Sequence, residues 1–445
     1  MKTIKTVQIL IVALAATLLS IPAAAQLTLG AKAKADTKGA DATATSETET
    51  AGEPAAEPAP EPVAEEVAPT PIAYSEPIVS DAPVADAKVG GDGVAGWDNG
   101  FYIKTLDDNF KLKINGTLKS RFTLYNQETP VIGDDGEPGT NHTNYANFAV
   151  PYLRFALSGN IFSPRFTYAV IYDFATSGLI EGWGDFAFIQ DKLHLTVGEM
   201  KRPFSRDYIN STTANNAIFG SIGELGEGDD TGIMLSNNYR NVKGLEWAVG
   251  VFNRSVGSPY TNVNGADMAP AVVGRIGYNN GVNGYVASDF DGGPFRFGVA
   301  LSASTEFDHD GDNFSSHYLG LDGIIKVQGL SVSAAFYLEN IAGNGATGGA
   351  GFWDDAQMAR IGTFVKAAYL INKRFEPMAR YGMVHMYDLG DDINEEITGG
   401  FNWYIHGQNI KWETNVSLLT HRLGTDADPQ SVQDILVATQ LQFMF

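Results

Sequence analysis

The 445-residue sequence contains no cysteine, and it has only 30 lysines and arginines against 52 aspartates and glutamates. The absence of cysteine excludes disulfide scaffolds, thiolate zinc sites and cysteine nucleophiles. A formal net charge of −22 disfavours nucleic acid as a partner, because binding to phosphates needs clustered positive charge. The chain is rich instead in glycine (49 residues), phenylalanine (25) and tyrosine (18), a composition that suits many short strands.

Beyond its first residues the sequence also lacks any uninterrupted apolar run of the ~20 residues that a membrane-spanning helix needs. Residues 1–25 have the features of an export signal: Lys2 and Lys5, an apolar stretch from Ile9 to Ile21, and three alanines before Gln26. We interpret this stretch as a cleaved signal peptide, because its apolar part is short for a membrane anchor. Any later membrane span must be built from strands.

Residues 26–96 differ in composition from the rest of the chain. They hold 13 acidic residues against four lysines, with eight prolines between Pro54 and Pro83. Such a segment cannot bury a core, and its X-Pro steps favour extended chain. We predict a disordered acidic spacer, which acts as a plain tether or makes a periplasmic contact, followed by a folded body at 97–445.

From Trp97 onward the dominant pattern has period two, the signature of strands. In the first long segment, Phe110, Leu112 and Ile114 alternate with Lys111 and Lys113. The pattern predicts sixteen strands, at residues 110–124, 148–161, 166–176, 184–190, 193–200, 230–238, 244–253, 270–279, 295–304, 316–327, 330–340, 359–370, 374–385, 394–405, 409–421 and 432–445.

The connections between these segments alternate in length. Those after odd-numbered strands are long, as at 127–147, 201–229, 255–269, 341–358 and 421–433, whereas most others have two to four residues. This asymmetry is typical of outer-membrane barrels, with tight periplasmic turns and long external loops. The stretch 280–294 breaks the rule, so fourteen or eighteen strands remain open.

A soluble β-sandwich would also show alternation. Three features favour a transmembrane antiparallel β-barrel: small residues on the polar face, aromatic residues near strand ends such as Trp403 and Trp412, and a chain that stops on a strand at Phe445. The last feature resembles the signal that bacterial assembly machinery recognises. A barrel of sixteen strands keeps an aqueous channel. The sequence therefore predicts a bacterial outer-membrane porin that passes small solutes by diffusion.

Several motifs along residues 97–445 resemble those of the phosphate-selective porin O and P family. The most similar is Val197-Gly198-Glu199-Met200-Lys201-Arg202-Pro203-Phe204-Ser205, although the family usually has Gln where this chain has Glu199. Arg154-Phe155-Ala156-Leu157-Ser158-Gly159 and Gly399-Gly400-Phe401-Asn402-Trp403-Tyr404 are further matches. The resemblance implies a sixteen-stranded, usually trimeric channel for anions, so a homotrimer embedded in outer-membrane lipid and lipopolysaccharide is expected.

Charge on the inward-facing positions predicts a preference for small anions such as phosphate. The inward acids are five by the same reading, Glu246, Asp173, Asp322, Glu376 and Glu413. Other acids are assigned to loops: Asp134, Asp135, Glu137, Glu224, Glu227, Asp229, Asp230, Asp308, Asp310, Asp312, Asp391, Asp392, Glu395 and Glu396. Rings of Lys and Arg in a narrow bore favour anions. The alternative is that these cations pair with lumen acids and only brace the wall. The predicted channel-lining cations are Lys111, Lys113, Lys119, Arg121, Arg154, Arg275, Arg296, Lys326, Lys366, Arg380 and Lys411.

The long connection at 201–229 is expected to be a constriction loop, by resemblance to porins in which this loop folds inward. Lys201, Arg202 and Arg206 lie at its start. Its later acids, including Glu224 and Asp230, either pair with these cations or face the pore. If they face the pore, the preference for anions weakens.

Other chemistry is sparse. The run Asp308-His309-Asp310-Gly311-Asp312 has the flavour of a calcium loop but fails the EF-hand pattern, and the seven histidines lack metal-ligand spacing, so no metal or cofactor is expected. An enzymatic barrel, such as a protease or lipase, is the rival class. Three functions stay open for a non-enzymatic barrel: an anion-preferring porin, a general non-selective porin, and a mainly structural envelope barrel.

Overall fold

The computed structural model describes residues 94–132, 138–189, 192–211, 213–226, 228–253, 270–282, 284–309, 314–343, 356–386, 392–423 and 430–445. The predicted signal peptide lies outside these residues, and so does the predicted spacer except for its last three residues. All described elements belong to one compact unit, Pro69–Phe445. Strand β1 begins at Ala95.

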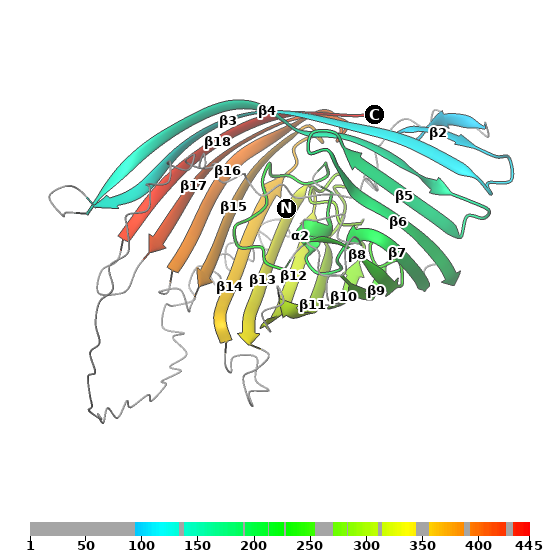
Figure 1. Cartoon of the computed structure of the whole chain (residues 1–445). Coiled ribbons are helices and arrows are strands. Elements are labelled where there is room, and N and C mark those ends of the chain that lie inside the picture. The colour runs from blue at the N-terminus through cyan, green and yellow to red at the C-terminus, as the bar shows by residue number, and fades with distance from the viewer. Residues whose placement is uncertain are drawn as a thin grey trace, which may run out of the picture. The chain divides into compact units, whose positions relative to one another are not determined.

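Sixteen antiparallel strands, β3 to β18, form a closed sheet in which each pairs with the next and β18 pairs with β3 (Figure 1). The predicted all-β transmembrane barrel is confirmed, and each of the sixteen predicted segments overlaps one strand. Two short strands, β1 and β2, are an addition: β2 pairs with β3 at Lys111–Ile114, and β18 pairs with β3 from Thr117 onward. The strands are β1 (Ala95–Trp97), β2 (Phe101–Lys104), β3 (Lys111–Ile132), β4 (Pro138–Asn160), β5 (Phe166–Asp173), β6 (Gly178–Ile189), β7 (Leu193–Lys201), β8 (Asp229–Ser236), β9 (Gly244–Phe252), β10 (Ala271–Asn280), β11 (Arg296–His309), β12 (Phe314–Val327), β13 (Leu330–Gly343), β14 (Ala356–Tyr369), β15 (Phe375–Met386), β16 (Asp392–His406), β17 (Ile410–Leu423) and β18 (Gln430–Met444).

The sheet has an apolar outside and a polar inside. Along β16, Ile397 and Trp403 are 60% and 50% exposed, whereas the intervening Asn402 is fully buried. On β15, Glu376 is fully buried between exposed neighbours. A water-soluble sheet would bury the apolar residues instead, so the outer face suits lipid and the inner face suits water or a polar filling. No helix in the described parts of the chain is long and apolar enough to cross a membrane.

The first hairpin corrects one expectation. The stretch 127–147 was predicted to be a long loop, but β3 and β4 continue through most of it, with Gln127 opposite Thr143 and Ile132 opposite Pro138. Polar residues occupy both faces of the hairpin there, so the sequence does not alternate between apolar and polar residues. The unusual length of the connection between β10 and β11, residues 281–295, is confirmed, and the strand count of sixteen holds.

The wall of the barrel is uneven. Strands β5 to β10 have 8 to 12 residues, and we call them the short half. Strands β11 to β18 have 12 to 15 residues, and we call them the long half. The two halves differ in what covers their inner faces.

Candidate functional site in the barrel interior

The connection between β7 and β8, residues 202–228, lies inside the sheet, where Figure 1 shows its short helix α2 (Arg206–Ile209) enclosed by strands. Ser205 caps the helix, because its side chain accepts a hydrogen bond from the backbone N–H of Tyr208 at 3.4 Å. Phe204 is 1% exposed and stacks on Tyr337 of β13, with ring centroids 6.0 Å apart. We call residues 202–228 the inner loop.

Glycine lets the inner loop approach the wall closely. A Cβ atom added to Gly223 would lie 2.0 Å from the carbonyl oxygen of Thr363 on β14, and one added to Gly362 would lie 2.3 Å from the carbonyl oxygen of Gly223. No side chain fits in that space, so backbone packs directly on backbone. The inner loop is therefore pressed against the long half.

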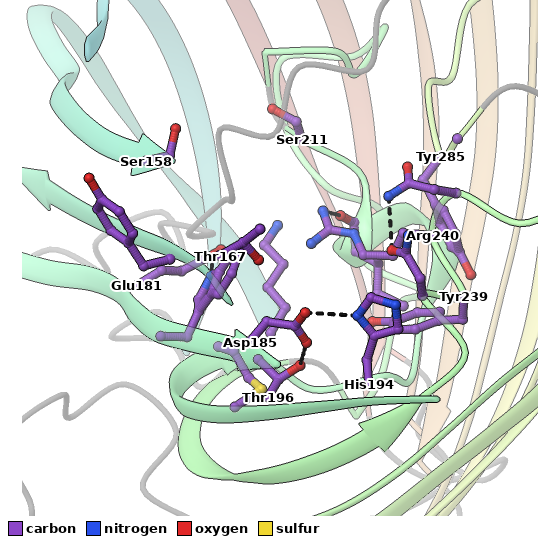
Figure 2. A pocket seen from close by; sticks show the side chains of 18 of the residues that line it. Ser158, Thr167, Glu181, Asp185, His194, Thr196, Ser211, Tyr239, Arg240 and Tyr285 are labelled. Carbon is purple, nitrogen blue, oxygen red and sulfur yellow. Dashed lines mark hydrogen bonds and ion pairs between the residues drawn. The ribbon is translucent and has the colours of Figure 1, made fainter. Parts of the chain in front are cut away.

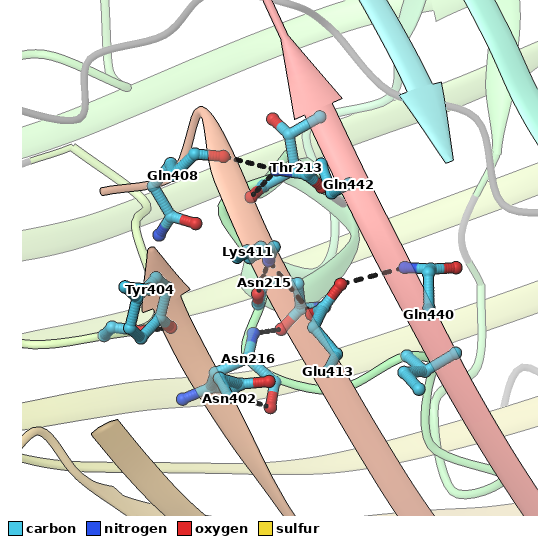
Figure 3. Close-up of polar contacts among 12 residues, drawn as sticks. Thr213, Asn215, Asn216, Asn402, Tyr404, Gln408, Lys411, Glu413, Gln440 and Gln442 are labelled. Carbon is cyan, nitrogen blue, oxygen red and sulfur yellow. Dashed lines mark hydrogen bonds and ion pairs between the residues drawn. The ribbon is translucent and has the colours of Figure 1, made fainter. Parts of the chain in front are cut away.

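Side chains of the long half hold the inner loop largely by its backbone carbonyls. Arg380 donates to the carbonyl oxygens of Phe219 at 2.6 Å and Gly220 at 2.8 Å. Lys411 donates to that of Asn215 at 2.7 Å, and Asn402 to that of Asn216 at 3.0 Å. Figure 3 shows these contacts on β16 and β17, beside Glu413 and Gln440.

The predicted channel-lining cations of β3 and β4 face the interior with polar or aromatic partners. Arg154 pairs with Asp173 at 2.7 Å. Arg121 donates to Gln440 at 2.9 Å and lies over the ring of Phe219 in the inner loop, 4.5 Å from its centroid. The remaining three are Lys111 over the ring of Tyr102, Lys113 with its ammonium 3.9 Å from Asp98, and Lys119 over the ring of Tyr152.

The other predicted cations, on β10 to β17, are nine-tenths or more buried. Most form short ion pairs with acids. The pairs are Arg275 with Asp322 (2.6 Å), Arg296 with Asp289 (2.5 Å) and Asp291 (2.6 Å), Lys366 with Asp207 (2.7 Å), Arg380 with Glu396 (2.7 Å) and Lys411 with Glu413 (3.0 Å). Lys326 donates instead to the carbonyl oxygens of Val286 and Ser288. The interior cations thus also hold the strands of the wall together and bind the segments that pass inside the barrel.

The three cations predicted at the start of the constriction loop are buried as well. Lys201 donates to the carbonyl oxygen of Tyr208 at 2.6 Å, and Arg202 pairs with Asp230 and with Glu306. Arg206 lies 3.5 Å from Asp322 and 3.6 Å from Glu246, and its guanidinium stacks over the ring of Tyr285 at 4.1 Å.

The assignment of acids needs correction. Asp229 and Asp230 belong to β8 and Glu396 to β16, although all three were assigned to loops, and all three are buried. Further buried acids were missed because they lie near strand ends, where alternation is a weak guide: Glu181, Glu199, Glu306, Glu339 and Asp434. Among the described residues, buried carboxylates therefore outnumber buried Lys and Arg, contrary to the count from the sequence. The loop acids Asp134, Asp135 and Asp391 lie outside the described residues.

A cavity of about 670 Å³ remains between the inner loop and the wall of β4 to β8. Its lining includes Lys113 and Lys201, two of the predicted cations, and also Arg165 and Arg240, which the sequence reasoning missed because they lie in turns. Asp98, Glu181 and Asp185 are its acids. Figure 2 shows Glu181 and Asp185 on one side and Tyr239, Arg240 and Tyr285 on the other. This cavity therefore lies along the short half, mostly at the end that carries the short turns.

Asp185 is the centre of a small polar group in this cavity. It lies 2.8 Å from Nδ1 of His194 and accepts a hydrogen bond from Thr196 at 2.9 Å (Figure 2). Within the described residues no group of three or more His, Asp and Glu side chains could hold a metal ion. Part of the run Asp308–Asp312 lies outside them.

The inner loop carries one acid with a strongly shifted pKa. Burial, reinforced by the nearby carboxylate of Asp207, raises the pKa of Glu224 to about 8. Ser205 donates a hydrogen bond to Glu224, which partly opposes the shift. Glu224 is therefore largely neutral at pH 7.

The phosphate-selective porin O and P family matches residues 133–445. The chain belongs to this family. It is an outer-membrane porin, in agreement with the resemblance and the location inferred from the sequence. A curated relative, an uncharacterized protein of Aquifex aeolicus (strain VF5), is 35% identical over 100 residues, which are 21% of this porin and 23% of that protein. The porin thus spans less than a quarter of the length of that relative.

Solved structures that resemble this porin are distant in sequence. The outer membrane channel DcaP of Acinetobacter baumannii has a TM-score of 0.50 at 12% identity, covering 75% of this porin and 97% of that chain. The anion-selective porin from Comamonas acidovorans has a TM-score of 0.49 at 12% identity, covering 75% and 99%. The likeness to DcaP supports the barrel fold.

Proposed function

We propose that this porin passes small anions, phosphate among them, along the cavity between the inner loop and the short half. The observation that carries the proposal is the lining of that cavity, where Lys113, Arg165, Lys201 and Arg240 outnumber three carboxylates. Lys201 and Arg240 donate to the backbone carbonyls of Tyr208 and Ile209, and both also interact electrostatically with Glu181. A net positive lining in a low-dielectric bore favours anions.

The remaining predicted cations act in this proposal as the charged wall behind the inner loop. Arg275 and Arg380 have carboxylate partners, so they add little net field. Lys326 and Arg121 donate to uncharged groups, and their charges interact with Asp289 and Glu413 respectively. The selectivity of the porin therefore depends on the difference between the positive charge of the interior Lys and Arg residues and the negative charge of the interior Asp and Glu residues, which are similar in size.

A general porin with little selectivity is the second candidate. Its supporting observation is that Glu181 and Asp185 line the same cavity as the cations. Phosphate itself would need grouped Arg and Lys donors at the narrowest point, because planar guanidinium groups match its oxygens.

The test is the reversal potential of the purified porin in a planar bilayer under a salt gradient, repeated with added phosphate. The double variant Lys113→Gln with Arg165→Gln is expected to lower the anion-to-cation permeability ratio by about twofold, because two charges leave the lining. Lys373→Gln with Arg374→Gln, in an exposed turn of the long half, is the matched control. A wild-type reversal potential near zero or toward the cation would favour the general porin, and absence of conductance would favour a structural barrel. A wild-type anion preference that both double variants keep would show that Lys113 and Arg165 do not set it.

The assembly and processing that accompany this function are also proposed. A homotrimer is supported by the family resemblance, and outer-membrane lipid and lipopolysaccharide contact the apolar outer face. Residues 1–25 are removed on export and residues 26–96 form a periplasmic spacer. Chemical cross-linking of the native membrane and N-terminal sequencing of the mature protein test these points.

A further inference from the structure

The connection between β10 and β11 lies at the end of the barrel where the other described turns are short. β12 and β13, for comparison, are joined by Gln328 and Gly329 alone, both with positive φ, as a two-residue hairpin requires. Residues 281–295 are far more than a hairpin needs. We call Gly284–Asp291 the inner turn, because Tyr285 to Asp289 are buried.

The inner turn is fastened to the long half. Lys326 of β12 donates to the carbonyl oxygens of Val286 at 2.6 Å and Ser288 at 2.9 Å. The Ser288 hydroxyl lies 3.0 Å from Glu376 on β15 and 2.9 Å from the hydroxyl of Tyr404 on β16. The inner turn thus reaches from its own hairpin to strands four and five places along the sheet.

The inner turn also contacts the inner loop. Tyr285 lies under the guanidinium of Arg206, and the backbone N–H of Ala287 donates to the carbonyl oxygen of Ala214 at 3.4 Å. Gly284, Tyr285 and Val286 line the cavity proposed as the solute path. The inner turn therefore forms part of the boundary of that path at the short-turn end.

We propose that the inner turn is a second constriction, which sets the largest solute that passes the short-turn end, and that Lys326 is its anchor. A buried ammonium group is costly unless its hydrogen bonds are made, and two carbonyls of the inner turn make them. The inner loop and the inner turn then limit the path in series. This inference rests on the proposed channel function.

The inner turn has an electrostatic consequence as well. Its acids Asp289 and Asp291 pair with Arg296 on β11, and its carbonyls occupy Lys326. Removing the inner turn takes away the negative charges of Asp289 and Asp291. It also exposes the positive charges of Arg296 and Lys326 at the same end of the barrel. A wider path and a stronger anion preference should therefore appear together, which bracing of the wall alone would not produce.

The experiment compares three variants with wild type in planar bilayers: Lys326→Met, replacement of residues 281–294 by Asn-Gly, and the exposed-turn control Lys192→Met. Readouts are single-channel conductance, the largest neutral polyethylene glycol that enters, and the reversal potential. The first two variants are expected to conduct about twofold more, because conductance follows the narrowest cross-section. They should also admit larger polymers, and the replacement should shift the reversal potential toward the anion.

Folding is checked by heat-modifiable electrophoretic mobility, and if Lys326→Met does not fold, the turn replacement decides. Folded variants with wild-type conductance and the same polymer limit would overturn the second constriction while leaving the channel function intact. A wild-type protein that does not conduct would overturn the channel function and this inference together.

Discussion

The long half and the short half of the barrel both turn a polar face inward, but different things lie against those two faces. Strands β11 to β18 use their polar inner faces to bind the inner loop and the inner turn, so their charges end in ion pairs and carbonyl contacts. Strands β5 to β8 and the neighbouring β4 leave a cavity in front of their polar residues. The same alternating pattern therefore builds a packed interior in front of one set of strands and leaves a polar cavity in front of the other. A residue that points inward does not for that reason alone line the channel.

Loss of an anchor in the long half should have the largest effect on this difference. Arg380→Met removes two hydrogen bonds to the inner loop and leaves Glu396 without its cationic partner. We expect the free energy of unfolding to fall by ~3 kcal/mol, because a buried charge loses its partner. Urea titration of the refolded porin measures it, with Arg374→Met as the exposed control. An unchanged midpoint would mean that the inner loop is held without Arg380.

A smaller effect is expected from neutralising acids one at a time in the two halves. Glu181→Gln in the cavity should raise the anion-to-cation permeability ratio by about twofold, since it removes a negative charge from the lining. Glu413→Gln, in the packed half, should leave that ratio nearly unchanged, because Glu413 lies against Lys411 and outside the cavity lining. Equal shifts in the two variants would show that the path is not confined to the short half.

A change of pH should act on the packed interior through one acid of the inner loop. The pKa of Glu224 is raised to about 8 in the folded porin, above its ordinary value of 4.5, so its contribution to stability is complete below pH 4.5. The contribution declines as pH rises through 8, where the carboxylate forms beside Asp207. Wild type should therefore unfold more readily at pH 9 than at pH 6, and Glu224→Gln should lose most of this difference. Thermal unfolding of both proteins at the two pH values gives the comparison.

Sixteen strands could be predicted from the sequence because alternation between an apolar outside and a polar inside is a local property. The long first hairpin could not, since residues such as Asn144 and Asn147 give polar character to both faces. The short strands β1 and β2 were missed because three or four residues carry too little periodicity.

The partners of the interior cations could not be predicted, because they depend on where a distant segment passes. Lys366 meets Asp207 and Arg296 meets Asp289 through the paths of the inner loop and the inner turn. Arg165 and Arg240 were missed because they lie in turns, where side chains do not alternate between the inside and the outside of the barrel. The assignment of eleven cations to the channel lining, and of Lys201, Arg202 and Arg206 to a constriction loop, remains a prediction.

The wall binds the inner loop and the inner turn largely through backbone carbonyls, including those of Phe204, Asn215, Phe219 and Val286. Such contacts depend on the route of the segment and not on the identity of its side chains. Mutations that alter those side chains can therefore accumulate without detaching the segment. The strands can therefore keep their register while the side chains of the inner loop and the inner turn change. Changes of this kind would alter which solutes pass without altering the barrel.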